Sequence, residues 1–264
     1  MGTAAIPNRL VAVACLLFAV GLTACNGDKR SSSSTAASTR HSGPAPTQSV
    51  DSATTGRISG VILLSGTAPV PTKLAIGEPG CKAAQSGTVY DERVLAKGGK
   101  LQNSFVYIRS GLEAYAFDTP KSEVVIDQKG CIYKPRIVGV QVDQTLTFVN
   151  SDSLMHNVRT SPTQNDSTNF AMPTRGQRRT QTFESPEVAI KTGCDVHPWM
   201  RSYVGVVAHP HFAVTGADGA FAFNGVPPGS YVIEAWHEVY GRQSKKLTLK
   251  AKGSQQIELS FTAK

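Results

Sequence analysis

The chain has 264 residues, a formal net charge of +8 and 40% hydrophobic residues. This length and composition are typical of a globular protein with one large or two small domains. The positive charge is spread along the chain and forms no long basic stripe of the kind that nucleic-acid-binding proteins present. The sequence therefore predicts no nucleic-acid partner and favours an acidic protein partner or an anionic surface.

The first residues predict an export signal. Arg9 precedes an apolar stretch, 10–22, that is too short to span a bilayer comfortably. The stretch runs into Leu-Thr-Ala-Cys at 22–25, which resembles the bacterial lipoprotein box. The resemblance implies cleavage after residue 24, acylation of Cys25 and a membrane-anchored protein that faces the periplasm or the cell exterior. The alternative is an ordinary signal peptide cut at the same place, with Cys25 incidental.

Residues 25–56 are rich in Ser, Thr and Ala and lack apolar periodicity, which predicts a flexible tether. From residue 57 onward, short runs of alternating apolar residues are separated by Gly, Pro, Asn and Asp. The predicted strands are 58–64, 105–108, 145–149, 220–223, 231–236, 247–250 and 257–261. Because no stretch shows a sustained helical pattern, the sequence predicts an all-β protein built from sandwich or barrel domains.

The five cysteines limit the disulfide chemistry. Cys15 lies in the predicted signal, and Cys25 is the predicted lipid site. In an oxidising compartment Cys81, Cys131 and Cys194 can form one disulfide and leave one thiol. Since Cys194 stands at a metal-ligand spacing, the economical pairing is Cys81 with Cys131, although the sequence leaves the other pairings open.

Two segments hold residues that bind transition metals. His156 lies in the first, and Cys194, His197 and Met200 follow Cys-x2-His-x2-Met spacing in the second. A thiolate, two imidazoles and a thioether form the donor set of a mononuclear electron-transfer copper site. Zinc is the competing metal, but structural zinc sites usually combine Cys and His and do not use Met. A second alternative is four unrelated side chains that are buried for packing.

Residues 118–208 resemble the cupredoxin family, and its amicyanin branch in particular. The motifs that carry the resemblance are Tyr-Lys-Pro at 133–135, the strand at 142–150, Met-His-Asn-Val at 155–158 and Cys-Asp-Val-His-Pro-Trp-Met-Arg at 194–201. The resemblance implies a Greek-key β-sandwich with one type 1 (blue) copper ion. It also implies that His156 and His197 bind through imidazole, Cys194 as thiolate and Met200 axially.

The same resemblance implies roles for residues around the ligands. The backbone N–H of Asn157 would donate to the sulfur of Cys194 and tie the two ligand loops together. Three apolar residues would cover the solvent side of the second histidine and form an electron port and docking patch: Met155, Pro198 and Trp199. Simple loop packing is the alternative role for Trp199. The polar, Arg-rich segment 161–179 departs from the family pattern, so its shape is not implied.

The stretch 212–231 resembles the carboxypeptidase regulatory-like (transthyretin-like) β-sandwich. Asp-Gly at 218–219 predicts a tight hairpin turn, and Pro-Pro-Gly at 227–229 predicts a corner before an aromatic-led strand. Domains of this kind usually begin with a strand like 58–64. The resemblance therefore implies a small second sandwich that serves as a scaffold.

The position of that first strand raises the question of domain order. We expect residues 57–117 to join residues 209–264 in the second sandwich, with the cupredoxin domain, 118–208, inserted between them. Two consecutive domains, 57–208 and 209–264, are the alternative.

Together these features predict a membrane-anchored blue copper protein that carries single electrons between extracytoplasmic redox partners. We expect a transient redox protein partner, contact with the membrane through the N-terminal lipid, no enzymatic activity and no small-molecule substrate. The alternative functions are copper handling without electron transfer, and a surface adhesion or carbohydrate-binding module. His209, His211 and His237 leave a second metal site open, although separate surface or interdomain histidines are the expectation.

Overall fold

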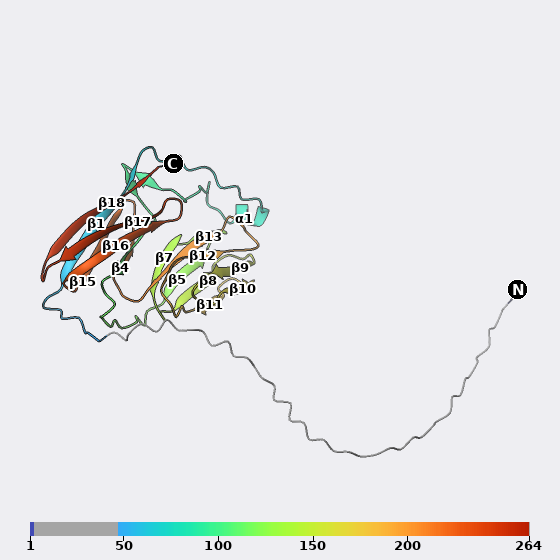
Figure 1. Ribbon diagram of the computed structural model, residues 1–264. Coiled ribbons are helices and arrows are strands. Elements are labelled where there is room, and N and C mark those ends of the chain that lie inside the picture. The colour runs from blue at the N-terminus through green and yellow to red at the C-terminus, as the bar shows by residue number, and fades with distance from the viewer. Residues whose placement is uncertain (3–46, 264) are drawn as a thin grey trace, which may run out of the picture. The chain divides into compact units, whose positions relative to one another are not determined.

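The computed structural model describes residues 1–2 and 47–263, and the folded part lies within 47–263 (Figure 1). The predicted signal, the predicted lipid site Cys25 and most of the predicted tether lie outside the described residues. The backbone amides of Thr47 and Gln48 both donate to the carbonyl of Ala114. The last part of the predicted tether is therefore hydrogen-bonded to the folded chain. No helix among the described residues is long and apolar enough to cross a membrane.

Strands make up nearly all of the regular structure, which confirms the prediction of an all-β protein. The described residues contain one α-helix, α1 (Pro79–Ala83). A first group of strands comprises β1 (Gly56–Ser65), β2 (Ala96–Lys97), β3 (Lys100–Leu101), β4 (Phe105–Ser110), β14 (Phe212–Val214), β15 (Ala220–Val226), β16 (Gly229–His237), β17 (Gly241–Leu249) and β18 (Ser254–Thr262). A second group comprises β5 (Val124–Gln128), β6 (Tyr133–Lys134), β7 (Ile137–Gln141), β8 (Leu146–Asn150), β9 (His156–Ser161), β10 (Thr168–Met172), β11 (Arg178–Gln181), β12 (Glu187–Gly193) and β13 (Arg201–Val207).

The second group forms two sheets with strand orders β10-β9-β12-β13-β7 and β11-β8-β5-β6. One apolar cluster fills the space between these sheets, with Ile126 and Phe148 from one sheet packed with Val158 and Val204 from the other. We call β5–β13 the inserted sandwich. Its parallel neighbours, β5 with β8 and β7 with β13, are not consecutive in the chain, so the connections cross between the sheets.

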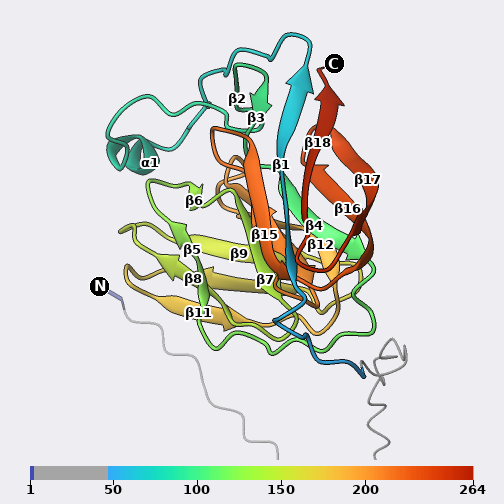
Figure 2. The same cartoon turned by 90° about the vertical axis from the view of Figure 1, so that its left-hand side faces the viewer.

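The first group forms the other two sheets, and its strands come from both sides of the inserted sandwich in the sequence. β1 pairs with β15 and with β18, and β4 pairs with β14 and with β16. We call this group the split sandwich; Figures 1 and 2 show it beside the inserted one. Strand pairing alone defines these names, and the predicted domain boundaries at residues 118 and 208 stay predictions.

Alternating burial explains why the split sandwich folds as it does. Along β18 the buried residues are Ile257, Leu259 and Phe261, which face the core, while the polar residues between them are more exposed. β17 differs from its prediction, because it begins at residue 241 and the sequence predicted a start at 247. The reason is that β17 is an edge strand, so its first six residues are exposed and polar and carry no apolar alternation.

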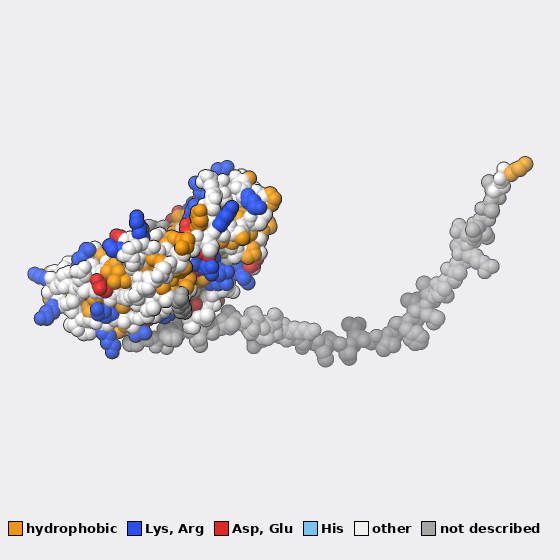
Figure 3. All heavy atoms as spheres, turned by 90° about the horizontal axis from the view of Figure 1, so that it is seen from above, with side chains coloured by type: hydrophobic (Ala, Val, Ile, Leu, Met, Phe, Trp, Pro, Cys, Tyr) orange, Lys and Arg blue, Asp and Glu red, His pale blue; other side chains and the backbone are white. Residues whose placement is uncertain are grey.

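The positive side chains are spread over the surface, as they are along the sequence. On the face shown in Figure 3, Lys and Arg side chains are distributed over the surface and do not form a single stripe.

The connection between β1 and β2 leaves the split sandwich, as Figure 2 shows, and carries α1. A disulfide joins Cys81 in α1 to Cys131, which is 50 residues away in the sequence. Both cysteines are fully buried in the apolar cluster of the inserted sandwich. The disulfide therefore holds α1, which lies within residues 57–117, against the inserted sandwich.

Candidate metal centre

Two loops at one end of the inserted sandwich carry the predicted ligands. His156 is the first residue of β9, and Cys194 and His197 lie between β12 and β13. β9 and β12 are antiparallel neighbours in which Gly193 pairs with Arg159. The end of β12 and the start of β9 therefore lie at the same edge of the sheet, and the two loops meet there.

The side chains of three predicted ligands converge. The Nδ1 atoms of His156 and His197 lie 3.0 Å apart, and the Sγ of Cys194 lies 3.7 Å from the Nδ1 of His197. All three ligand atoms are within 4.8 Å of one another. The exposed fractions of His156, Cys194 and His197 are 0%, 5% and 1%. One metal ion would reach all three donors in a site that excludes water.

Met200, the fourth predicted ligand, lies at the end of the same loop. Its backbone amide donates to the carbonyl of His197 over 2.9 Å, which closes the loop into a turn. Its side chain is buried in the apolar cluster that also contains Cys194. Met200 therefore shares a loop with Cys194 and His197 and an apolar cluster with Cys194.

Asn157 and Tyr133 connect the two loops. The backbone N–H of Asn157 lies 3.5 Å from the sulfur of Cys194, in the arrangement that the cupredoxin resemblance implies. The hydroxyl of Tyr133 donates to the carbonyl of Asn157 over 2.6 Å and lies 3.2 Å from the carbonyl of Gly193. Burial raises the pKa of Tyr133, so the hydroxyl keeps its proton and remains a donor.

Asp152 fixes the orientation of the first histidine. Its carboxylate accepts from the backbone amides of Gly130 and Cys131 over 2.7 and 2.8 Å, and it lies 2.9 Å from the Nε2 of His156. Burial lowers the pKa of His156, and the hydrogen bond with Asp152 opposes that shift. A carboxylate at Nε2 favours the tautomer with its proton on that nitrogen, which leaves the Nδ1 lone pair free for a metal.

Glu78 does the same for the second histidine. Its carboxylate forms a hydrogen bond with the Nε2 of His197, although Glu78 lies just before α1 and far from the ligand loops in sequence. The disulfide of Cys81 with Cys131 holds this segment beside the site. Both imidazoles therefore face each other through Nδ1 and contact a carboxylate through Nε2.

The residues around the predicted electron port are not all apolar, contrary to what the resemblance implied. Met155 is 50% exposed and Pro198 is exposed, but His197 is almost fully buried and Glu78, not an apolar ring alone, contacts its outer nitrogen. The ring centroid of Trp199 lies 5.2 Å from that of His197, and its Nε1 donates to the carbonyl of Cys131. Trp199 therefore packs within the loop, as the alternative role proposed, and the electron port remains a prediction.

Sequence reasoning missed both carboxylates. Asp152 precedes His156 by four residues, which is a weak signal because isolated acidic residues are common in loops. Glu78 precedes Cys81 by three residues. The predicted pairing of Cys81 with Cys131 could have located Glu78, since that disulfide carries the segment to the inserted sandwich.

The Arg-rich segment that departed from the family pattern forms β10 and β11 with the loop between them. Met172 at the end of β10 pairs with His156 across the ladder, and it is fully buried. The loop then returns to the first ligand loop, where the amide of Asn150 donates to the carbonyl of Gln177. This segment therefore supports the strand that begins with His156.

The remaining histidines form no second centre in residues 47–263, where every candidate group of metal donors includes His156 or His197. His209 and His211 are buried side by side, and the Nε2 of His209 lies 2.8 Å from the carbonyl of Ile108. His237 is fully buried and stacks on Tyr240. All three are therefore buried and not on the surface.

The donor set fits copper. Two imidazole nitrogens and a buried cysteine sulfur converge, with a Met in the same loop, and these are donor types that copper accepts. A structural zinc site would usually supply four donors of Cys or His type, and three converge here among the residues that the structure describes.

No family model and no curated protein matches the sequence. Several solved structures resemble part of the chain. An oxidised proline-to-alanine mutant of amicyanin is 25% identical with a TM-score of 0.29, and the match covers 32% of this chain and 81% of that one. A purple cupredoxin from Nitrosopumilus maritimus is 26% identical with a TM-score of 0.27, over 33% and 99% of the two chains.

A copper-containing nitrite reductase from Thermus scotoductus SA-01 is 20% identical with a TM-score of 0.28. That match covers 56% of this chain but 28% of the reductase. The metal binding of these proteins is not assigned to this chain. What this chain can bind follows from its own side chains.

Proposed function

We propose that the chain holds one copper ion at His156, Cys194 and His197, with Met200 as a weak axial ligand, and transfers single electrons outside the cytoplasm. The observation that carries the proposal is the pair of Nδ1 atoms 3.0 Å apart. Each Nε2 contacts a carboxylate, which favours the tautomer that leaves the Nδ1 lone pair for a metal. A cation between the two Nδ1 atoms would accept both lone pairs, and the thiol sulfur beside them selects a soft metal.

The surrounding residues support rapid one-electron exchange. Bound copper would supply a couple between its two oxidation states, and the chain would keep the donors in place in both. Tyr133 and Asn157 tie the two loops together, and Asp152 and Glu78 orient the imidazoles. A donor set that does not move lowers the reorganisation that accompanies each transfer.

The location is part of the same proposal. The disulfide of Cys81 with Cys131 suits an oxidising compartment, and the lipoprotein-like box at 22–25 suits attachment to a membrane through Cys25. The partner would be another redox protein that docks transiently, and no enzymatic step is proposed.

The test is the spectrum of the copper-loaded protein beside two variants. We expect an intense visible thiolate-to-copper band and narrow hyperfine splitting in electron paramagnetic resonance. Cys194→Ser should lose both signals, whereas Met155→Ala, which changes an exposed neighbour of His156, should keep them. A colourless protein, or a Cys194→Ser variant with the same band, would contradict the proposal.

One observation favours copper handling without electron transfer as a second candidate. His197 is only 1% exposed, because Glu78 covers the nitrogen that the sequence placed toward solvent. Stopped-flow reduction by a small soluble reductant separates the two candidates. A coloured site that exchanges electrons slowly in the native protein and quickly in Glu78→Ala would favour handling, and fast exchange in both would favour electron transfer.

A further inference from the structure

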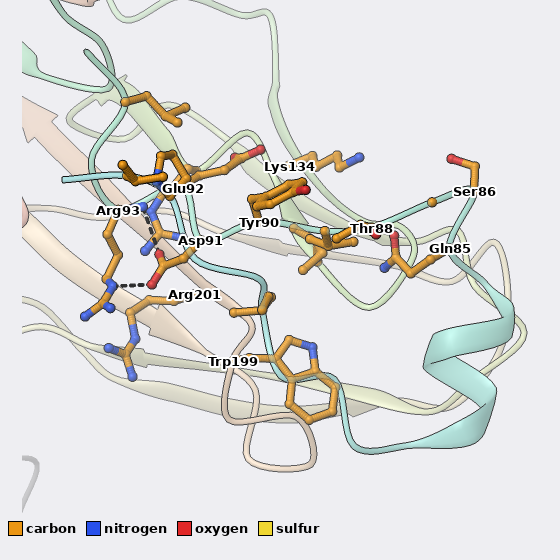
Figure 4. A pocket seen from close by; sticks show the side chains of 18 of the residues that line it. Gln85, Ser86, Thr88, Tyr90, Asp91, Glu92, Arg93, Lys134, Trp199 and Arg201 are labelled. Carbon is orange, nitrogen blue, oxygen red and sulfur yellow. Dashed lines mark hydrogen bonds and ion pairs between the residues drawn. The ribbon is translucent and has the colours of Figure 1, made fainter. Parts of the chain in front are cut away.

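A pocket of about 800 Å³ opens beside the candidate metal centre (Figure 4). One wall is the connection between β1 and β2, including Tyr90 and Arg93, and another is the ligand loop with Pro198 and Trp199. Pockets of this size accommodate a small organic molecule. Because the ring of Trp199 also packs against His197, anything bound here would lie one side chain away from a proposed ligand.

Unpaired positive charge marks one part of the pocket. Among the cations that line it, Arg93 pairs with Asp91, and Arg136 pairs with Glu238. Arg201 also lines the pocket, and among the described residues its buried Nε has no hydrogen-bond partner and its guanidinium has no carboxylate in salt-bridge contact.

A buried donor on a charged group without a partner is unfavourable, and an anion would satisfy it. Lys134 adds a second unpaired cation, whereas Glu92 is the one lining carboxylate without a pairing partner in the described chain, and it is exposed. The unpaired charges of the lining therefore sum to a positive value. This balance favours a ligand with one negative charge.

Aromatic rings supply the other half of the recognition. Tyr90 is 53% exposed, and Trp199 is half-buried with its indole N–H already bonded to Cys131. In the view of Figure 4, Arg93 and Arg201 lie toward one end of the pocket, Gln85 and Ser86 toward the other, and Tyr90 and Trp199 between them. Exposed rings inside a concave site favour a flat apolar ligand, since stacked or edge-on aromatic pairs are stabilising.

We propose that this pocket binds a small aromatic carboxylate, with its carboxylate on the guanidinium of Arg201 and its ring beside Trp199 and Tyr90. The sequence predicted no small-molecule substrate, and the molecule proposed here is bound and not converted. The inference rests on the pocket alone, so it holds whether or not the adjacent centre carries electrons.

Calorimetric titration of the metal-free protein with 4-hydroxybenzoate tests the proposal. We expect one molecule bound per chain. Neutral 4-hydroxybenzamide should bind at least tenfold more weakly because it lacks the charge, and inorganic phosphate should bind at least tenfold more weakly because it lacks the ring. Equal affinity for any two of these probes, or no heat from 4-hydroxybenzoate at millimolar concentration, would overturn the proposal.

Variants locate the binding. Arg201→Gln should weaken 4-hydroxybenzoate binding at least tenfold, and Tyr90→Ala should weaken it severalfold. Tyr90→Ala changes an exposed side chain, so it reports on the pocket even if Arg201→Gln fails to fold. Arg175→Gln, which removes an exposed arginine outside the pocket, should bind like the native protein. Unchanged affinity in Tyr90→Ala, or equal weakening in Arg175→Gln, would place the binding elsewhere and overturn the proposal.

The metal-free protein also separates this test from that of the proposed function. With Trp236→Phe in place, Trp199 is the one remaining tryptophan, and its emission should change as 4-hydroxybenzoate binds. That change needs no copper. A missing visible band in the copper-loaded protein would contradict the proposed function without affecting the binding result. Unchanged Trp199 emission would contradict the pocket proposal without affecting the proposed copper site.

Discussion

The two sandwiches bury polar groups in different ways. In the split sandwich, buried Glu234 accepts from the hydroxyl of Tyr107 over 2.6 Å and from Arg242, so its charge meets partners within the protein. In the inserted sandwich, the buried Nδ1 atoms of His156 and His197 lie 3.0 Å apart, with the Sγ of Cys194 beside them. The first arrangement satisfies a buried charge with fixed hydrogen-bond donors, whereas the second gathers three atoms that can each give a lone pair to one cation. We therefore expect the split sandwich to act as a scaffold and the inserted sandwich to hold the binding centre.

The sandwiches are also joined by a third apolar cluster. Phe105, Tyr107 and Trp236 of the split sandwich pack there with Ile137 and Val207 of the inserted one. The two sandwiches should therefore unfold together, although a substitution can still act on one of them alone.

Removing a large core ring from each sandwich gives the largest expected effect. Phe148 and Phe261 are both fully buried, so Phe148→Ala and Phe261→Ala should each lower the free energy of unfolding by about 3–5 kcal/mol. Because the third cluster joins the sandwiches, urea unfolding should remain a single transition by circular dichroism and by tryptophan fluorescence in both variants. Two separate transitions would show that the sandwiches unfold independently.

The split sandwich should show its own pH dependence. Burial, followed by the charge of Arg136, lowers the pKa of His237 from 6.5 to about 4. Below pH 6.5 the unfolded chain then binds a proton at this histidine that the folded chain does not bind. The folded state is therefore at its full stability above pH 6.5 and loses stability as the pH falls toward 4. Between pH 7 and 4.5 the native protein should lose up to about 3 kcal/mol at this residue. His237→Phe should lose correspondingly less over the same range in urea unfolding, and an identical loss would contradict the assignment.

The contact between the sandwiches should be sensitive to one methyl group. A Cβ on Gly205 would lie 2.5 Å from ring atoms of Phe105, and Phe105 is fully buried. Gly205→Ala should therefore lower the free energy of unfolding by about 1–3 kcal/mol through overpacking. Gly87→Ala is the matched control, since a Cβ there would meet nothing within 4 Å, and its stability should be nearly that of the native protein. Equal stability of the two variants would mean that the interface adjusts freely.

Removing the charge of the carboxylate on His197 should give the smallest effect on folding stability, because the change is confined to the candidate metal centre. Glu78→Gln keeps the size of the side chain but removes the charge that favours a proton on Nε2, so copper affinity should fall roughly 10–100-fold. Competition with a chelator of known affinity measures the change. Glu92→Gln, which alters an exposed carboxylate of the same connection, should bind copper like the native protein. Equal affinities of Glu78→Gln and the native protein would remove Glu78 from the centre.

Periodicity and spacing predicted much of this molecule. Alternation along residues 257–261 predicted the core face of β18, and the spacing of Cys194, His197 and Met200 located one candidate ligand loop. Interactions between segments that are far apart in the sequence leave no local pattern. The exposed first half of β17 depends on its one neighbour, β16, for hydrogen bonds and has no apolar alternation.

The carboxylates of the centre were hidden for a similar reason. Glu78 contacts His197 across 119 positions of sequence, and a single acidic residue before a short helix signals nothing by itself. Asp152 acts through its contacts with two amides and an imidazole, which only the folded chain brings together. The candidate donors were readable from the sequence as residue types, and the carboxylates that contact them were not.

The parallel pairing of β1 with β18 has a mechanical consequence. The ladder runs from Arg57 opposite Ser254 to Ser65 opposite Thr262, so the start of the first strand and the end of the last lie at opposite ends of the pair. Tension applied between residues 56 and 263 would load all of these hydrogen bonds in shear at once and would not peel them apart one by one. Because β5–β13 lie between β1 and β18 in the sequence, the strands that carry the candidate metal donors would bear little of that force until the β1–β18 ladder had broken.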